Sequence, residues 1–517
     1  MMFLTSEDDR RISISNYVLW FLIVVLLYLI FCHKKSTRVN EFLSTLPGPL
    51  ELPFVGCVPT FLLQHSRYSD WMRIFDQYAT CRMYRFSIFS DTFVVLSDPE
   101  VIQMVLRNPN CYDKDKSIYD LFRLPEILST ANGRKWLNER KAILPSFHPK
   151  LLSSFDATCQ RHTQHLMTTL RKHAERGEPF DLGQEMTLLF IDIMSDSFLG
   201  VSANAQLNGL KEFANSLLTV PDCIMERVFI PPFRNDFIWR LCGRMQRFDA
   251  VKKSLYSVAK QLIVKRKRCS KNESLLKDEK NRMFLDILLK NSENKESKDE
   301  SKLVFETGEI FTAGSITMGT TVSWVLLLSE VFPEVGDRLR GEIDTLMRTG
   351  NGVLTPEACN GLEYLDMVLK ETLRHFGVPF IVRRSSEDVQ IRGFKTIPKD
   401  TRILIMLASL HHHPDFWEKP YEFYPEHFSP KNVSSRMKNT FLPFSLGMRD
   451  CPGGKYAIQT MKYVLARTLL EMKFTAQHMK RWSNVYTEND LKFGFTQVPT
   501  KGFMATVKLR NEATKHG

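Results

Sequence analysis

The segment FSLGMRDCPG occupies residues 444–453 and places a single cysteine, Cys451, among glycines. A run with apolar residues at helical spacing follows directly, from Ala457 onward. Glycine at positions 447 and 453 lets the backbone approach something flat and large. Backbone N–H groups at the start of a helix stabilise an anion, and a thiolate is such an anion. The segment therefore predicts an ionised cysteine that faces a planar ligand.

Two further side chains of this segment extend that prediction. Arg449 offers a planar fork of N–H donors, which matches the geometry of a carboxylate. Phe444, seven residues before the cysteine, can shield one side of the sulfur. Together these residues describe a thiolate ligand to a metal macrocycle that carries acidic side groups.

Two other interpretations of the same segment compete with this one. A phosphate-binding loop is suggested by the Gly-Gly-Lys triplet that starts at Gly453, but Tyr456 stands where that motif requires Ser or Thr, and Arg449 stands where it requires Gly. A structural cysteine in a glycine-rich turn is the second alternative. Neither accounts for the arginine and the phenylalanine at their spacing from Cys451.

The composition of the chain indicates a large globular protein. Of its 517 residues 43% are hydrophobic, 11% are aromatic and 25% are charged, which excludes wholesale disorder. The net charge of +12 suits an anionic membrane or an acidic partner, but no nucleic-acid reader motif accompanies it, and we expect no nucleic-acid partner. None of the ten cysteines forms a Cys-x-x-Cys pair, which argues against a zinc ribbon and favours reduced thiols in the cytosol.

An apolar segment near the N-terminus predicts a membrane anchor. Tyr17–Cys32 contains 16 residues without a charge, and extension back to Ile12 gives 21 residues, which span about 30 Å as a helix. A cleaved signal peptide is one alternative, although no small-residue cleavage site follows, and a buried core helix is another. Basic residues follow the segment at Lys34, Lys35 and Arg38, so the positive-inside tendency places the rest of the chain in the cytosol.

These features divide the chain into three parts. We expect a membrane anchor in residues 1–33, a basic and proline-rich linker in residues 34–60, and a globular domain with the cysteine motif in residues 61–517. Leu-Pro-Gly-Pro at 46–49 ends any helix, because proline removes N–H donors. The globular domain is predicted to be mainly α-helical with small β-sheets, since helical periodicity dominates and short β-like runs such as 92–96 interrupt it.

A second long apolar segment could be either a membrane-spanning helix or a helix buried in the protein core. Residues 310–328 carry no charge, so hydropathy alone marks them as a membrane span. Eight of these 19 residues are Gly, Ser or Thr, and Glu306 and Glu309 precede them on the same helical pattern. We therefore predict a long helix that runs through the middle of a soluble domain. The Lys-, Glu- and Ser-rich stretch at 265–301 predicts an exposed connection with a short helix at 284–289.

In order and spacing these features resemble the cytochromes P450, which are haem-thiolate monooxygenases. The pattern FxxGxRxCxG at 444–453 matches the cysteine motif of that family, and the resemblance extends from the anchor to the C-terminus. It implies the P450 fold, preceded by one transmembrane helix. It also implies a haem b whose iron has Cys451 as its axial ligand. The haem contacts carried over from this motif are Phe444, Gly447, Arg449 and Gly453.

Three other matches to the family occur in the expected order. Trp136 and Arg140 form a WxxxR pair one helical turn apart, which the family directs at a haem propionate. Glu371 and Arg374 form an ExxR pair, a structural pair beneath the haem in the family. Arg384 stands where relatives place another propionate-binding arginine. A surface stack and an ordinary i, i+3 ion pair are the alternatives for the first two matches.

Two histidine-containing segments depart from the family pattern. PEHF at 425–428 resembles the PERF segment, with His427 in the arginine position, from which it can still hydrogen-bond the ExxR pair. Three consecutive histidines at 411–413 look like a metal tract, but relatives have a loop there, and we predict no metal site in it.

Residues 312–317, TAGSIT, align with the family's AGx(D/E)T element on the helix that crosses the haem. The resemblance assigns a groove for dioxygen to Ala313 and Gly314, and an oxygen-activating hydroxyl to Thr317. Ile316 replaces the acid that relays protons in the family. Either water and Thr317 carry the protons, or turnover is slow and leaky, or the reaction needs no oxygen activation. Some relatives link haem covalently through a Glu at the position of Ala313, so we expect no such ester here.

The downstream segments are most similar to the animal family-4-like branch, which includes many insect members and fatty-acid ω-hydroxylases. The resemblance implies a monooxygenase of the endoplasmic reticulum (microsomal) membrane with a cytosolic catalytic domain. It would insert one oxygen atom of dioxygen into a lipophilic substrate such as a fatty acid, a steroid, a hormone or a xenobiotic. Its electrons would come from NADPH through cytochrome P450 reductase, with cytochrome b5 as a candidate second donor. A haem-thiolate isomerase or dehydratase and a degenerate haem-binding protein remain the alternatives.

Overall fold

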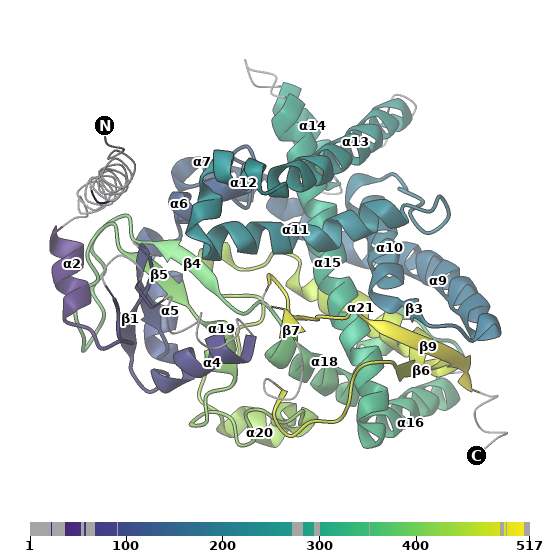
Figure 1. The fold of residues 1–517 in the computed structure, drawn as a ribbon. Coiled ribbons are helices and arrows are strands. Elements are labelled where there is room, and N and C mark those ends of the chain that lie inside the picture. The colour runs from purple at the N-terminus through teal and green to yellow at the C-terminus, as the bar shows by residue number, and fades with distance from the viewer. Residues whose placement is uncertain are drawn as a thin grey trace, which may run out of the picture.

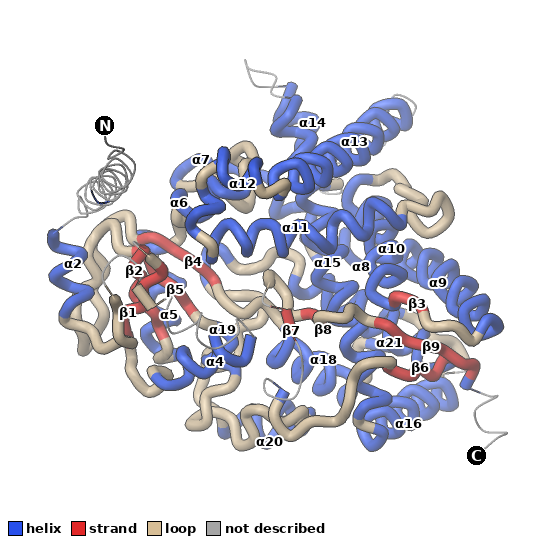
Figure 2. The backbone as a smooth tube through the Cα atoms, in the orientation of Figure 1, coloured by secondary structure: helices blue, strands red, loops and turns tan. Residues whose placement is uncertain are grey.

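The computed structural model is mainly helical, with three small β-sheets in the part of the chain that it describes (Figure 1, Figure 2). This agrees with the predicted fold class. The predicted anchor in residues 1–33 lies outside the described residues except for Leu22, and so do parts of the linker. The residues described are Leu22, 37–52, 56–57, 68–89, 91–270, 283–293, 300–350, 352–485, 491–492 and 494–510.

Helices make up most of the described chain (Figure 2). In chain order they are α2 (Thr37–Ser44), α4 (Tyr68–Gln77), α5 (Pro99–Arg107), α6 (Lys116–Tyr119), α7 (Gly133–Ile143), α8 (Pro149–Ser153), α9 (Asp156–Arg176), α10 (Leu182–Met194), α11 (Lys211–Phe229), α12 (Asp236–Leu241), α13 (Arg244–Ser270), α14 (Phe284–Glu293), α15 (Glu300–Val331), α16 (Pro333–Thr349), α17 (Pro356–Cys359), α18 (Glu363–Phe376), α19 (Leu407–His411), α20 (Pro430–Ser435) and α21 (Gly454–Glu471).

The largest sheet lies at the N-terminal side of the molecule and has the strand order β1-β2-β5-β4 (Figure 1). Its strands are β1 (Met83–Ile88), β2 (Asp91–Leu96), β4 (Ile381–Arg384) and β5 (Arg402–Ile405). β2 pairs in parallel with β5, and the other two pairings are antiparallel. A three-stranded sheet joins β3 (Phe180–Asp181), β9 (Met504–Leu509) and β6 (Met472–Ala476), and a two-stranded sheet joins β7 (Leu491–Lys492) and β8 (Val498–Pro499).

Helix α15 crosses the middle of the molecule and contains the apolar segment 310–328 (Figure 1). By length and composition it is able to span a membrane, but 67% of its most apolar window is buried inside the protein. Its hydroxyls bond to carbonyls one turn back, as from Thr307 to Leu303 at 2.8 Å, so they are satisfied without water. Trp324 stacks on Phe376 of α18 with ring centroids 3.7 Å apart. The prediction of a core helix is confirmed.

Small residues along α15 let neighbouring helices approach it closely. A Cβ atom at Gly308 would lie 3.1 Å from Leu255 of α13, and one at Gly319 would lie 3.2 Å from the backbone of Thr187 in α10. Such close packing fixes the height of α15 over the cysteine segment. The Gly, Ser and Thr content of this helix is therefore a packing feature.

Candidate active site

The cysteine loop joins a short 3-10 turn, Gly447–Arg449, to the N-terminus of α21. The backbone N–H of Cys451 donates to the carbonyl of Phe444 at 2.9 Å, which closes the loop. Burial raises the pKa of the Cys451 thiol, whereas hydrogen bonds from the amides of Gly453 and Gly454 and the charge of Arg140 lower it. The thiol sits deep in the protein but is open to a cavity. The net effect within the protein is a raised pKa, so these amides and this charge offset the effect of burial only in part.

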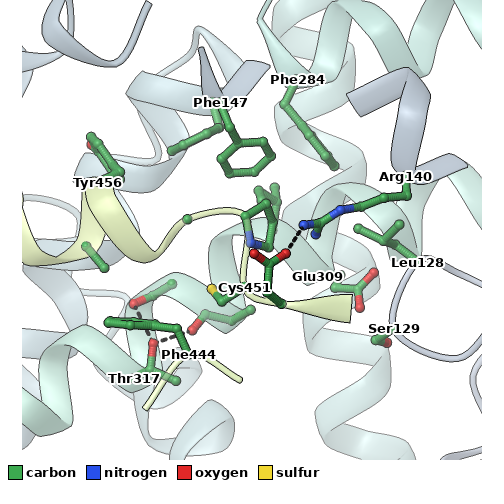
Figure 3. A pocket seen from close by; sticks show the side chains of 18 of the residues that line it. Leu128, Ser129, Arg140, Phe147, Phe284, Glu309, Thr317, Phe444, Cys451 and Tyr456 are labelled. Atoms are coloured by element: carbon green, nitrogen blue, oxygen red, sulfur yellow. Dashed lines mark hydrogen bonds and ion pairs between the residues drawn. The ribbon is translucent and has the colours of Figure 1, made fainter. Parts of the chain in front are cut away.

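The cavity beside Cys451 has a volume of about 360 Å³ and an apolar lining over most of its wall (Figure 3). Such dimensions and composition are typical of cofactor and small-molecule sites. α7, α15, the cysteine loop and the start of α21 enclose it. The structure brings nine of the sequence-predicted site residues to this wall, and they are Trp136, Arg140, Ala313, Gly314, Thr317, Phe444, Arg449, Cys451 and Gly453.

Trp136 and Arg140 lie one turn apart on α7, as their spacing predicted, and both reach the cavity. The guanidinium of Arg449 lies 4.2 Å above the ring of Trp136, a cation–π contact that orients it. Arg140 donates to the carboxylate of Asp450 at 2.7 Å (Figure 3). The two residues directly before Cys451 thus hold the cysteine loop against α7.

Three buried cations, Lys114, Arg383 and Arg449, lie close to one another, and Lys114 and Arg449 line the cavity. Burial lowers the pKa of each, and the mutual repulsion within the group lowers the pKa of Lys114 and Arg449 further. None of the three has an ion-pair partner among the described residues. The Nε atom of Arg449 is buried without a hydrogen-bond partner. Because an unpaired buried charge is costly, this wall is built to receive anions.

Arg384 does not reach the cavity, although the sequence comparison assigned it a haem propionate. Its side chain is 37% exposed and pairs with Asp400 at 3.3 Å and with Asp115 at 4.0 Å. Arg383, its neighbour on β4, is buried and faces the cation group instead. Successive residues of a strand point to opposite faces, so only one of the two arginines can lie with Lys114 and Arg449.

Gly447 is also absent from the cavity wall. It adopts a positive φ of 80°, and a Cβ atom there would clash with the carbonyl oxygen of Leu106 at the end of α5. A glycine is needed at this position because the cysteine loop packs directly on the α5 backbone. Gly453, by contrast, lines the cavity.

The ExxR pair is completely buried. Arg374 donates to both carboxylate oxygens of Glu371 at 2.8 and 2.9 Å, and it also donates to the carbonyls of His411 and Pro420. Burial alone would raise the pKa of Glu371, but the charge of Arg374 and hydrogen bonds from Arg374, His375 and His427 hold it well below its usual range. This geometry ties α18 to the segment that precedes the cysteine loop.

The histidines of the unusual segments have structural partners. His427 lies 3.2 Å from Glu371, so it occupies the role that an arginine side chain would have there. His411 accepts the backbone N–H of Leu442 at 2.9 Å, and His412 contacts His375 at 3.0 Å. Among the residues that the structure describes, no group of His, Cys, Asp and Glu is arranged to hold a metal ion.

Ala313, Gly314 and Thr317 face the cavity from α15. The Thr317 hydroxyl donates to the carbonyl of Ala313 at 2.8 Å, within its own helix. Gly314 makes room for Met194 of α10, since a Cβ there would lie 2.7 Å from its terminal methyl group. Ile316 packs against the hydrophobic core and does not line the cavity.

The polar residues of the cavity that sequence reasoning missed include Lys114, Ser129 and Glu309. Lys114 and Ser129 come from irregular segments, where no periodicity indicates orientation. Glu309 carried a usable signal, because it precedes Ala313 by four residues and Thr317 by eight on the same helical face. Burial raises the pKa of Glu309 to about 7.

Comparison with known proteins identifies the family. The cytochrome P450 family model matches residues 46–504. Cytochrome P450 4c21 of Blattella germanica is 28% identical over 516 residues, covering 97% of this chain and 100% of that protein. Cytochrome P450 4V2 of Rattus norvegicus is 32% identical over 435 residues, or 81% of each chain, and cytochrome P450 4c3 of Drosophila melanogaster is 27% identical over 478 residues, or 87% of this chain and 88% of that protein. With insect and mammalian family-4 proteins as relatives, the chain belongs to the cytochrome P450 monooxygenase family.

Proposed function

We propose that this chain is a membrane-anchored haem-thiolate monooxygenase that acts on a lipophilic substrate. The observation that carries the proposal is Cys451, whose thiol opens on a largely apolar cavity and receives the amides of Gly453 and Gly454. When bound, haem supplies the chemistry that activates dioxygen, inserts one oxygen atom into the substrate and releases the other as water. The apolar lining favours an apolar substrate and excludes bulk water.

The described residues fit a haem b. Cys451 would supply the thiolate ligand, and the buried cations Lys114, Arg383 and Arg449 would supply partners for the propionate carboxylates. The buried Nε of Arg449, which has no partner within the protein, is the clearest sign that an acceptor belongs there. Ala313 occupies the position of the carboxylate that forms an ester in some relatives, so we propose a haem without a covalent link.

Two neighbouring residues of α15, Thr317 and Ile316, determine how protons can be delivered in the cavity. Thr317 holds a hydroxyl at the cavity surface, where it can turn from the Ala313 carbonyl toward the reacting oxygen. Ile316 provides no acid one residue away, and we propose that water ordered at Thr317 delivers the protons instead.

Replacing Arg383 with glutamine will lower haem retention more than replacing Arg384 with glutamine. Arg383→Gln removes a buried cation from the propionate wall, so we expect the purified variant to retain much less haem than the wild type. Arg384→Gln removes a half-exposed ion pair and is expected to retain a wild-type haem content. The measurement is the molar ratio of haem to protein. Equal ratios in the two variants would contradict the assignment of Arg383.

The location and the partners are proposals from the same family resemblance. We propose that residues 1–33 anchor the chain in the endoplasmic reticulum membrane, that residues 34–60 form a linker and that residues 61–517 form the cytosolic catalytic domain. NADPH-cytochrome P450 reductase would supply electrons, with cytochrome b5 as a second donor. The net charge of +12 suits docking of an acidic electron donor.

The test uses the full chain in membranes. The preparation is reduced, exposed to carbon monoxide and examined by difference spectroscopy, and a red-shifted band of the thiolate type is the expected result. NADPH consumption with added reductase is then measured against a panel of lipophilic compounds, and substrate-dependent consumption with hydroxylated product is expected. Bound haem without the red-shifted band would contradict the thiolate assignment.

A haem-thiolate isomerase or dehydratase is the second candidate, and the observation that favours it is Ile316 in the acid position. Such an enzyme rearranges a peroxide substrate and needs neither reductase nor NADPH. Conversion of a lipid hydroperoxide in the absence of both, together with no NADPH-dependent product, would favour it over the monooxygenase.

A further inference from the structure

Glu309 faces the cavity although no family motif assigns it a role. It lies on α15 on the same face as Ala313 and Thr317, eight residues before Thr317, which corresponds to about 12 Å along the helix axis. Figure 3 shows Glu309 beside Ser129 on one side of Cys451 and Thr317 on the other side. A molecule that spans this distance would contact both ends of the cavity.

The Glu309 carboxyl group receives hydrogen bonds from Ser129 and, as a carboxylate, keeps acceptor capacity for a ligand. The other acidic residue of the cavity wall, Asp450, is already paired with Arg140 at 2.7 Å. Glu309 has no ion pair among the described residues. Its nearest apolar neighbours on the wall include Leu128 and Ile310, so it is a polar point in an apolar lining.

Glu309 gains or loses its proton near neutral pH. Burial raises its pKa to about 7, and the charge of Glu306 adds to the rise. The hydroxyl and the amide of Ser129 and the charge of Lys114 act in the opposite direction. Glu306 and Lys114 are the charged groups that face Glu309, from its own helix and from the opposite wall. At pH 8 Glu309 is mainly a carboxylate, which accepts hydrogen bonds and repels anions.

We propose that Glu309, together with Ser129, is a specificity-determining anchor that binds the hydrogen-bond donor of a lipophilic substrate. The substrate class is then a long apolar molecule with a hydroxyl group at one end and the oxidised carbon several bonds away. A chain that ends in a carboxylate is disfavoured, because it would meet a second carboxylate in an apolar site. This inference rests on the proposed monooxygenase function and specifies its substrate.

The experiment compares three matched ligands of the full-length holoenzyme: dodecanol, its methyl ether and dodecanoate. Each dissociation constant comes from the change in haem absorption on titration at pH 8. We expect dodecanol to bind about tenfold more tightly than the ether, the ratio that corresponds to about 1.4 kcal/mol for a hydrogen bond to a charged acceptor. Dodecanoate is expected to bind more weakly than dodecanol.

Two variants assign these differences to Glu309. Glu309→Met keeps the length of the side chain but removes the acceptor, so the alcohol-to-ether ratio is expected to fall to about one and the binding of dodecanoate to tighten. Glu306→Gln removes the same charge one turn earlier on α15, outside the cavity wall, and is expected to keep the wild-type ratio. Both variants should retain the red-shifted carbon monoxide band.

The pH dependence gives an independent readout. Because Glu309 loses its proton near pH 7, the preference of the wild type for the alcohol is expected to grow from pH 6 to pH 8, and Glu309→Met is expected to show no such growth. A ratio that is unaffected by Glu309→Met, in a protein with the red-shifted band, would contradict this inference alone. Absence of the band in the wild type would contradict the proposed function, and the inference with it.

Discussion

Replacing Cys451 with alanine will abolish the red-shifted carbon monoxide band and all NADPH-dependent product formation. Cys451 carries the only sulfur on the cavity wall apart from the thioethers of Met194 and Met318, and a thioether carries no negative charge to donate. The amides of Gly453 and Gly454 would then point at a methyl group. We expect the loss of activity to be complete within the detection limit, because no other thiol lines the cavity among the described residues.

The matched control is Cys242→Ala. Cys242 is a free, exposed cysteine at the end of α12 and does not line the cavity. Its removal is expected to leave the band and the turnover unchanged. Residual product formation by the Cys451 variant, measured by chromatography with the same reductase, would show that the thiolate is dispensable and would overturn the assignment.

Replacing Arg374 with alanine will prevent the accumulation of folded protein. The substitution removes the cation that donates to both oxygens of the buried Glu371 carboxylate, and it also leaves the carbonyls of His411 and Pro420 without a donor. Breaking a buried ion pair in this way costs about 3–5 kcal/mol, against a total stability of about 5–15 kcal/mol for a typical domain. The measurement is the yield of folded protein and its unfolding midpoint in urea.

An exposed ion pair provides the comparison for Arg374. Lys399 and Glu387 lie 2.8 Å apart, with side chains that are 53% and 62% exposed. Glu387→Ala is expected to leave the free energy of unfolding almost unchanged, because water screens the pair and solvates the partner that remains. If Arg374→Ala unfolded at the same urea concentration as Glu387→Ala, the buried pair would not have the structural role given to it here.

Local spacing, together with the family motifs, was sufficient to predict nine residues of the cavity wall. Trp136 and Arg140 share a face of α7 because four residues make about one turn, and the same periodicity brings Ala313 and Thr317 together on α15. The loop around Cys451 is also local, since its closing hydrogen bond joins residues seven apart. Each of these geometries depends on a few adjacent residues only.

The remaining features depend on contacts between distant segments, which spacing does not encode. The choice between Arg383 and Arg384 is fixed by the pairing of β4 with β5, because a shift of one residue turns every side chain to the other face. The need for glycine at 447 arises from a contact with Leu106, more than 300 residues earlier in the chain. Ser129 meets Glu309 across a gap of 180 residues.

The group of buried cations beside the cavity, Lys114, Arg383 and Arg449, links the fate of the protein in the cell to its cofactor. Without anions these charges repel one another in a medium of low dielectric constant, so they oppose folding. A ligand that binds only the folded chain and neutralises them raises its stability by mass action. Newly synthesised chains should therefore accumulate in proportion to the haem supply. When haem is scarce, quality-control proteases would degrade the unliganded chains and lower the abundance of the protein.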